Sequence, residues 1–168
     1  MDQDNVDRLL QKLADTNAPL DLDVEGIVDR IGHIHKRIHW ALKETLVDYG
    51  LTPEDWHVMT SLGLRADGRT ASPGALARDL ELSSGAMTSR LDRLEQLGYV
   101  QRLPDPDDRR GVRVGLTDAG RKAWEGAIEV QGRKEAFFAS VLTKKEQRTL
   151  NDLLRKIALG LEATREGR

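Results

Sequence analysis

The side chains best suited to chemistry lie between residues 84 and 96. Outside its apolar stripe, this stretch carries small, hydroxyl-bearing or cationic residues: Ser84, Gly85, Ala86, Thr88, Ser89, Arg90 and Arg93. Serine and threonine hydroxyls can bond phosphates or base edges, and arginine can bond guanine through two hydrogen bonds. Amides at the start of a helix favour phosphate, and small residues there let the backbone come close to a nucleic acid. The stretch therefore predicts a DNA-binding surface.

A second candidate is segment 104–111, which is too polar to pack and lies between two β-like runs, 99–103 and 112–116. Its tip carries one acid and two cations: Asp108, Arg109 and Arg110. Arginines on such a turn could enter a minor groove, with the aspartate supporting them by charge-assisted bonds. The alternative interpretation of each segment alone is a solvated helix face and a solvated loop. Their order within one short stretch favours DNA binding.

The elements that position these side chains follow from the apolar pattern. Met87, Leu91 and Leu94 recur at i, i+4 and i+7, which predicts a helix over 84–96 that buries this side. Gly98 is expected to end it. Ser72-Pro73 favours the start of a shorter preceding helix. Helix, turn, helix and hairpin in this order are typical of a winged helix-turn-helix.

The flanking segments predict further helices, so the expected fold is mostly α with a small β-hairpin wing. The predicted organisation is a helical dimerisation domain built from 1–50 and 118–168 around a winged helix-turn-helix DNA-binding domain over 51–117. Helices are expected over about 4–17, 24–49 and 117–141, after Thr52-Pro53, and after a capping box at Thr143. The first and last helices carry apolar stripes wider than one small domain can easily cover, which indicates a homodimer. Its two recognition helices would lie about 34 Å apart, so the target DNA should be a near-palindrome.

Beyond these patterns, the run SRLDRLEQLGYVQRLPDPDDRRGVRVGLTDAGR, residues 89–121, resembles the MarR family of bacterial transcriptional regulators. The helix ending, the Asp-x-Arg of the wing at 108–110 and the LTDAG that begins the next helix all match in order. The resemblance implies a winged-helix homodimer that binds palindromic operator DNA, acts as a repressor and responds to a small ligand.

Within the family the chain is most similar to the PecS-like, urate-responsive branch, through its extra first helix, its LDLDVEG segment and SRLDRLEQLGY. The resemblance implies a set of residues that bind urate in that branch, and Arg90 and Arg102 match the arginines of this set. The first helix has no tryptophan, and His57 stands where the branch has an aspartate. We therefore expect the same pocket with a different, more anionic effector.

The effector pocket of this family often lies between the dimerisation helices and the winged domain. Here the resemblance implies a lining of His35, His39, Trp40, Trp56, His57 and Met59. Aromatic faces with a few polar groups suit a planar or anionic ligand. The alternative is that both tryptophans only fill the core.

His35 and His39, at i and i+4 on one helix face, could also hold a metal, and a zinc-type metal-responsive regulator is an alternative function. A third ligand is not evident, and the simpler interpretation is a pair of partly exposed helix residues, so no metal site and no cofactor are predicted. No enzyme motif occurs, so catalysis is not expected. A winged helix used only for protein contacts is a further alternative, which would show no salt-dependent DNA binding.

Composition sets the remaining bounds. With 168 residues, 39% hydrophobic and 32% charged, the chain predicts one helix-rich domain with a sizeable core. The net charge of −2 argues only weakly against DNA, because a neutral dimer can be locally basic. No apolar run approaches a membrane span, and the absence of cysteine excludes thiol-based redox sensing and fits a cytoplasmic protein.

Overall fold

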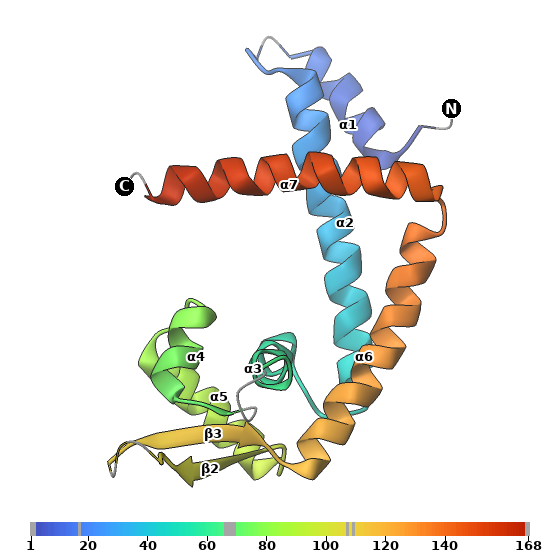
Figure 1. The fold of residues 1–168 in the computed structure, drawn as a ribbon. Coiled ribbons are helices and arrows are strands. Elements are labelled where there is room, and N and C mark those ends of the chain that lie inside the picture. The colour runs from blue at the N-terminus through green and yellow to red at the C-terminus, as the bar shows by residue number, and fades with distance from the viewer. Residues whose placement is uncertain (1–2, 17, 66–69, 107, 109, 167–168) are drawn as a thin grey trace. The chain divides into compact units, whose positions relative to one another are not determined.

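The computed structural model describes residues 3–16, 18–65, 70–106, 108 and 110–166, with side chains described as far as residue 164 (Figure 1). The chain divides into two compact units, Met1–Ile128 and Glu129–Arg168, which are treated separately below. The elements in chain order are α1 (Asn5–Ala14), α2 (Leu22–Val47), α3 (Pro53–Gly63), β1 (Thr70–Ala71), α4 (Pro73–Asp79), α5 (Ser84–Gln96), β2 (Val100–Pro104), β3 (Val112–Leu116), α6 (Asp118–Ala139) and α7 (Lys144–Glu166). The mostly helical fold with a β wing is thus confirmed.

The helices of the winged unit, α3 to α5 with the strands, begin at side chains that cap them. Thr52, Ser72 and Ser83 each accept a hydrogen bond from the backbone amide three residues further on. These caps satisfy amides that the first helical turn cannot pair internally. The predicted starts of α3, α4 and α5 are therefore confirmed, and the bounds of α5 are those predicted.

Helix α5 is terminated by Gly98, as predicted. Gly98 has φ +72°, a conformation that glycine adopts without steric cost. The amides of Gly98 and Tyr99 donate to the carbonyls of Glu95 and Leu94, both at 2.9 Å. This pattern closes the helix and turns the chain into β2.

The described strands form one antiparallel sheet in the order β1-β3-β2. The hairpin of β2 and β3 is the predicted wing, with Val100 opposite Leu116 and Pro104 opposite Val112. Strand β1 was not predicted, because two residues are too short to show an alternating pattern. The predicted loop 66–69 lies outside the described residues.

One hydrophobic core holds the winged unit together. Met87, Leu91 and Leu94 of α5 are buried against α3, α4 and the sheet, as the i, i+4, i+7 pattern predicted. Buried partners come from the other elements, among them Val58, Met59, Leu62, Leu76, Val100 and Val114. This packing leaves the opposite face of α5 exposed.

Helix α1 packs against the N-terminal half of α2 (Figure 1). Arg30 of α2 donates to Asp4, at 2.9 Å, and to Asp7, at 2.5 Å, the two acids of the α1 capping box. Helix α2 begins at Leu22 rather than at the predicted Val24, because Asp21 caps it by accepting from the amides of Asp23 and Val24. The start of the chain is thus held by polar contacts at helix ends.

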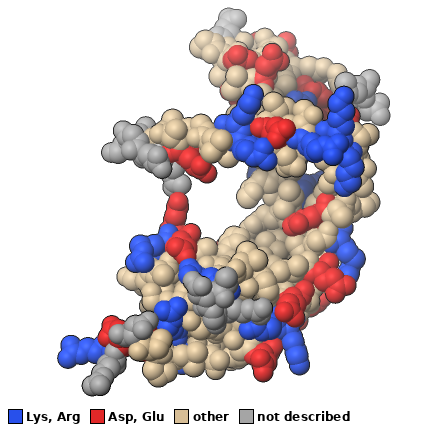
Figure 2. All heavy atoms as spheres, viewed as in Figure 1, with Lys and Arg blue, Asp and Glu red and all other residues tan. Residues whose placement is uncertain are grey.

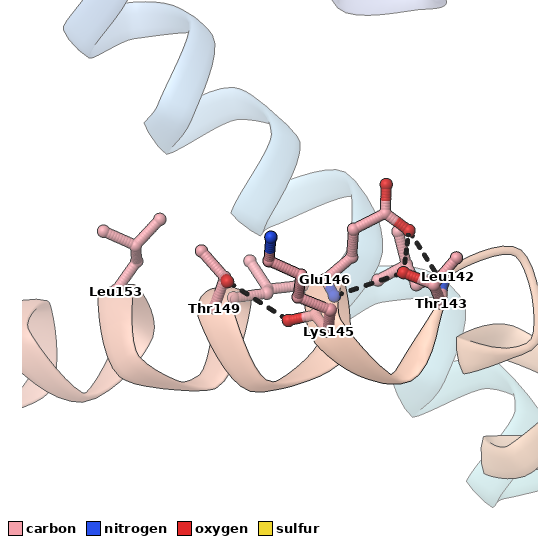
Figure 3. Close-up of a pocket in the computed structure, with 7 residues that line it drawn as sticks. Leu142, Thr143, Lys145, Glu146, Thr149 and Leu153 are labelled. Carbon is pink, nitrogen blue, oxygen red and sulfur yellow. Dashed lines mark hydrogen bonds between the residues drawn. The ribbon is translucent and has the colours of Figure 1, made fainter.

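The second unit is dominated by α7, whose predicted capping box is confirmed. Thr143 and Glu146 exchange backbone-to-side-chain hydrogen bonds (Figure 3). A shallow groove beside this cap is lined by Leu142, Leu150 and Leu153 together with the polar residues Thr143, Lys145, Glu146 and Thr149. None of the described helices is long and apolar enough to cross a membrane.

Candidate nucleic-acid interface

The exposed face of α5 presents the residue types that the sequence singled out. Ser84, Gly85, Thr88 and Ser89 are exposed, while Ala86 is half-buried. Two shallow grooves follow this face, one along α5 itself and one between α5 and the start of α3. The Thr88 hydroxyl donates to the carbonyl of Ser84 at 2.9 Å, so its lone pairs remain suited to accepting a hydrogen bond from a base or from a donor of a ligand.

Arg90 lies at the edge of this face, with about a quarter of its side chain exposed. Its guanidinium is 4.0 Å from the carboxylate of Glu54 at the start of α3. The pKa of Glu54 is lowered, first by a backbone amide and by the Thr52 hydroxyl, and to a smaller extent by Arg90. Among the described residues, Arg90 Nε is buried without a hydrogen-bond partner. Leaving a buried donor unpaired costs free energy.

Arg93 is half exposed, and its guanidinium is paired within the protein. Its Nε donates to Asp55 at 2.9 Å, and a terminal nitrogen donates to the Gly50 carbonyl at 2.7 Å. The Asp55 side chain is only 1% exposed, whereas that of Arg93 is 48% exposed. Arg93 therefore has two tertiary partners that no sequence pattern indicated.

The wing tip is shaped by Asp108. Its carboxylate accepts from the backbone amide of Arg110 at 2.9 Å, and its carbonyl accepts from the amide of Gly111 at 2.8 Å. The support expected from Asp108 thus acts on the backbone of the turn. Arg110 is exposed, and Arg109 lies outside the described residues.

Two arginines tie the wing to neighbouring elements, Arg102 to α5 and Arg113 to β1. Arg102 of β2 donates to Asp92, at 2.5 Å, and to Glu95, both on α5, and these partners raise its pKa, with the Asp92 hydrogen bond as the largest cause. Arg113 of β3 donates to the Thr70 hydroxyl at 2.9 Å. The family resemblance predicted an effector role for Arg102, whereas Arg113 was not predicted. An arginine within a short strand is the one feature of the sequence that points to the role of Arg113.

The predicted effector residues do not gather on one surface. Trp56 and Met59 are core residues, 8% and 0% exposed, so the alternative of tryptophan as core filler describes Trp56 in this structure. Trp40 is 70% exposed on α2, and His57 is exposed on α3. The effector pocket accordingly stays a prediction.

The histidine pair lies together, with the rings of His35 and His39 6.1 Å apart between centroids on the exposed part of α2. Within the described residues, no group of three or more possible ligands is arranged to hold a metal ion. Two imidazoles alone leave a zinc site incomplete.

Charge on the winged unit is mixed. Figure 2 shows basic and acidic side chains interspersed over the face in view, with no broad region of one sign. This agrees with the net charge of −2 and with the many arginine–carboxylate pairs of the unit. Attraction to a polyanion must then come from local groups such as Arg90 and Arg110.

A short helix, a turn, a second helix with a polar exposed face, and a β-hairpin define the winged helix-turn-helix class. Comparison with known proteins places the chain within that class. The MarR family model matches residues 51–112. The regulator PecS of Dickeya dadantii is 30% identical over 139 residues, covering 82% of this chain and 84% of PecS.

The multiple antibiotic resistance protein MarR of Escherichia coli is 35% identical over 117 residues, covering 69% of this chain and 79% of MarR. A crystal structure of an E. coli MarR variant complexed with operator DNA superposes with a TM-score of 0.68 at 30% identity, covering 83% of this chain and 99% of that one. The chain belongs to the MarR family of transcriptional regulators. Proteins of this family are not enzymes, which agrees with the absence of catalytic motifs.

Proposed function

We propose that this protein is a homodimeric repressor that binds near-palindromic operator DNA and is released by a small effector. The observation that carries the proposal is the exposed face of α5, where hydroxyl, glycine and arginine residues stand opposite a fully buried apolar stripe. The operator complex of the similar MarR variant supports a DNA target for this chain. A DNA target also accounts for the predicted cytoplasmic location.

The proposed DNA contacts fall into two groups. Residues of α5 lie in the major groove and read bases or bind phosphates, with Thr88, Ser89 and Arg90 as the base-reading candidates. In this proposal Arg110 enters the adjacent minor groove from a turn that Asp108 braces, and Arg109 is a second candidate from the sequence. Residues 51–117 form the DNA-binding domain of this proposal, and the helices of 1–50 and 118–168 form the dimer.

Dimerisation is supported by apolar side chains that the single chain leaves exposed. On α2 they include Ile27, Ile31, Ile34 and Ile38, and on α7 they include Leu150, Leu153, Leu154 and Ile157. Contiguous exposed apolar surface on helices is characteristic of a subunit interface. Two-fold symmetry then requires the two half-sites of the operator to be inverted copies.

The proposed effector is small and anionic or aromatic, as the PecS-like resemblance suggests. PecS matches over most of this chain, but α1 holds no tryptophan and His57 replaces an acid, so the effector differs from urate. Exposed His57 and Trp40 are the groups best placed to meet a ligand from solution.

Selection from a random duplex DNA pool tests the proposal. We expect an inverted repeat whose half-sites are centred about one helical turn apart. Binding to the selected duplex should weaken steeply with salt, because phosphate contacts release counterions. Recovery of no preferred sequence, together with no salt-dependent binding, would favour a protein-contact module instead.

Calorimetry with a panel of anionic and aromatic metabolites tests the effector. A hit should lower operator affinity, since a ligand shifts the protein toward the state that it binds better. His57→Ala should lose the response, while His33→Ala, an exposed histidine outside the predicted pocket, should keep it. A response that survives His57→Ala and Trp40→Ala would remove this pocket from the proposal.

A further inference from the structure

Arg93 stands at a junction of three helices. From the last turn of α5 its guanidinium reaches the Gly50 carbonyl, in the turn that follows α2, and the Asp55 carboxylate, in the first turn of α3. Gly50 has φ +65° and forms the corner between α2 and α3. One side chain of α5 thus holds both sides of that corner.

Asp55 is the buried half of this junction. Its Oδ2 accepts from Arg93 and also from the Thr52 backbone amide at 3.0 Å, as part of the α3 capping box. A carboxylate that is 1% exposed requires compensating donors, and these two donors supply them. Because it is buried, Asp55 cannot itself contact DNA.

The geometry points to Arg93 as a positioning residue, not a DNA contact: we propose that the Arg93–Asp55–Gly50 junction sets the orientation of the recognition helix relative to the α2–α3 corner. The proposal rests on the DNA-binding function proposed above. It gives Arg93 a different role from the base or phosphate contact that its place on the polar face of α5 suggests.

The arginine fork is essential to this role. A guanidinium can donate to a carboxylate and to a carbonyl at once in a fixed plane, whereas a lysine ammonium is a single point charge on a flexible stem. The junction also joins the end of α2 directly to α5. A displacement of the α2 end is then passed to the DNA-reading face through hydrogen bonds.

The positioning role and a phosphate contact predict different results. If Arg93 contacts a phosphate, Arg93→Met should reduce the slope of log K against log[salt] by about 1, because one fewer counterion is released. In that case Arg93→Lys should largely retain the affinity for DNA. For the junction, Arg93→Met, Arg93→Lys and Asp55→Asn each weaken operator binding by about tenfold, with the salt slope unchanged. Asp55→Asn removes a negative charge, which by electrostatics alone should strengthen binding to DNA. Weaker binding in this variant would therefore support the positioning role.

The experiment measures operator affinity of the full-length protein as a function of salt for these three variants and for the Arg93→Met/Asp55→Asn double variant. We expect the double variant to bind no worse than the weaker single variant, because both substitutions break one junction. Arg133→Met with Glu129→Gln, an exposed pair within α6, is the charge-matched control and should bind like wild type. Circular dichroism confirms that each variant is folded.

Wild-type affinity in Asp55→Asn, or a reduced salt slope with retained affinity in Arg93→Lys, would overturn the positioning role. If Asp55→Asn does not fold, Arg93→Lys decides by itself. If the wild type binds no DNA, the proposed function fails, and amide hydrogen exchange along α5 still tests the junction. If the α5 amides are protected from exchange equally well in Arg93→Met and in the wild type, the junction does not hold α5 and the positioning role is overturned.

Discussion

The winged unit and the long helices outside it bury their apolar residues in different ways. In α5 the stripe residues Leu91 and Leu94 are at most 1% exposed in the single chain. In α2 the stripe remains open as far as Ile38, with Ile34 58% exposed, and in α7 Leu153 is 53% exposed. Both kinds of helix have a regular apolar face, but the winged core covers that of α5 and, in α2, only the C-terminal end around Leu46.

Amphipathic periodicity therefore identifies a helix face that must be covered, but it does not identify the element or partner that covers it. Buried apolar area contributes about 25 cal/mol per Å² to stability, so the open stripes of α2 and α7 represent a large unused driving force. A second copy of the chain is the partner that the dimer proposal assigns to them. The winged unit, in contrast, is expected to keep its packing whether the protein is monomeric or dimeric.

The largest expected effect comes from the closed core. Leu94→Ala should lower the free energy of unfolding by about 2–5 kcal/mol, because it leaves a cavity in a well-packed site. Denaturant titration measures it, and the loss should be the same at low and high protein concentration. A loss that depends on concentration would mean that the winged core also needs the partner.

A substitution in the exposed apolar stripe of α7 should instead weaken the dimer. Leu154→Ala is expected to raise the dissociation constant of the dimer about 10- to 100-fold, since burying a leucine contributes about 1.5–3 kcal/mol. Sedimentation over a concentration series measures the change. Leu64→Ala, an exposed leucine outside the stripe, is the control, and an equal shift in both variants would contradict the proposed interface.

Arg110 at the wing tip is expected to affect DNA binding alone. Arg110→Ala should cost about 1–3 kcal/mol of operator binding, as expected for one arginine in a groove. Stability and the dimer should be unchanged, because Arg110 is exposed. A gel-shift titration of the folded variant measures the loss, and wild-type affinity would show that the wing does not contact the operator.

The smallest expected effect concerns α1. The pKa of Asp4 is lowered, first by the amide of Asp7 and then by Arg30. A depressed pKa means that Asp4 stabilises the folded state above its unfolded pKa near ~3.9, and that this contribution is lost as the pH falls through the folded value. The protection factors of the α1 amides, taken relative to the intrinsic exchange rate at each pH, should therefore be lower at pH ~3 than at pH ~6. Asp4→Asn should narrow that difference, whereas Asp15→Asn should leave it, and an unaltered difference in Asp4→Asn would contradict the assignment.

Much of the fold could be predicted because its determinants are local. The caps Ser72, Ser83 and Thr143 act on amides three residues away, and the apolar period of α5 spans only two turns. The turn at Gly98 likewise depends on one residue and its neighbours. Such signals lie within a short window of sequence, which is why helix type and order were predicted more reliably than tertiary contacts.

The sequence by itself determined the winged helix-turn-helix, the exposed polar face of α5 and the family resemblance, since periodicity, capping and motif order are written along the chain. The burial of Trp56 and Met59, the pairing of β1 with the sheet, and the hydrogen bond from Arg93 to Asp55 follow only from the three-dimensional packing. The partners of Arg93 are 38 and 43 residues away in sequence. A polar residue on a helix face can meet either solvent or a distant buried carboxylate, and the packing of the other helices selects between the two.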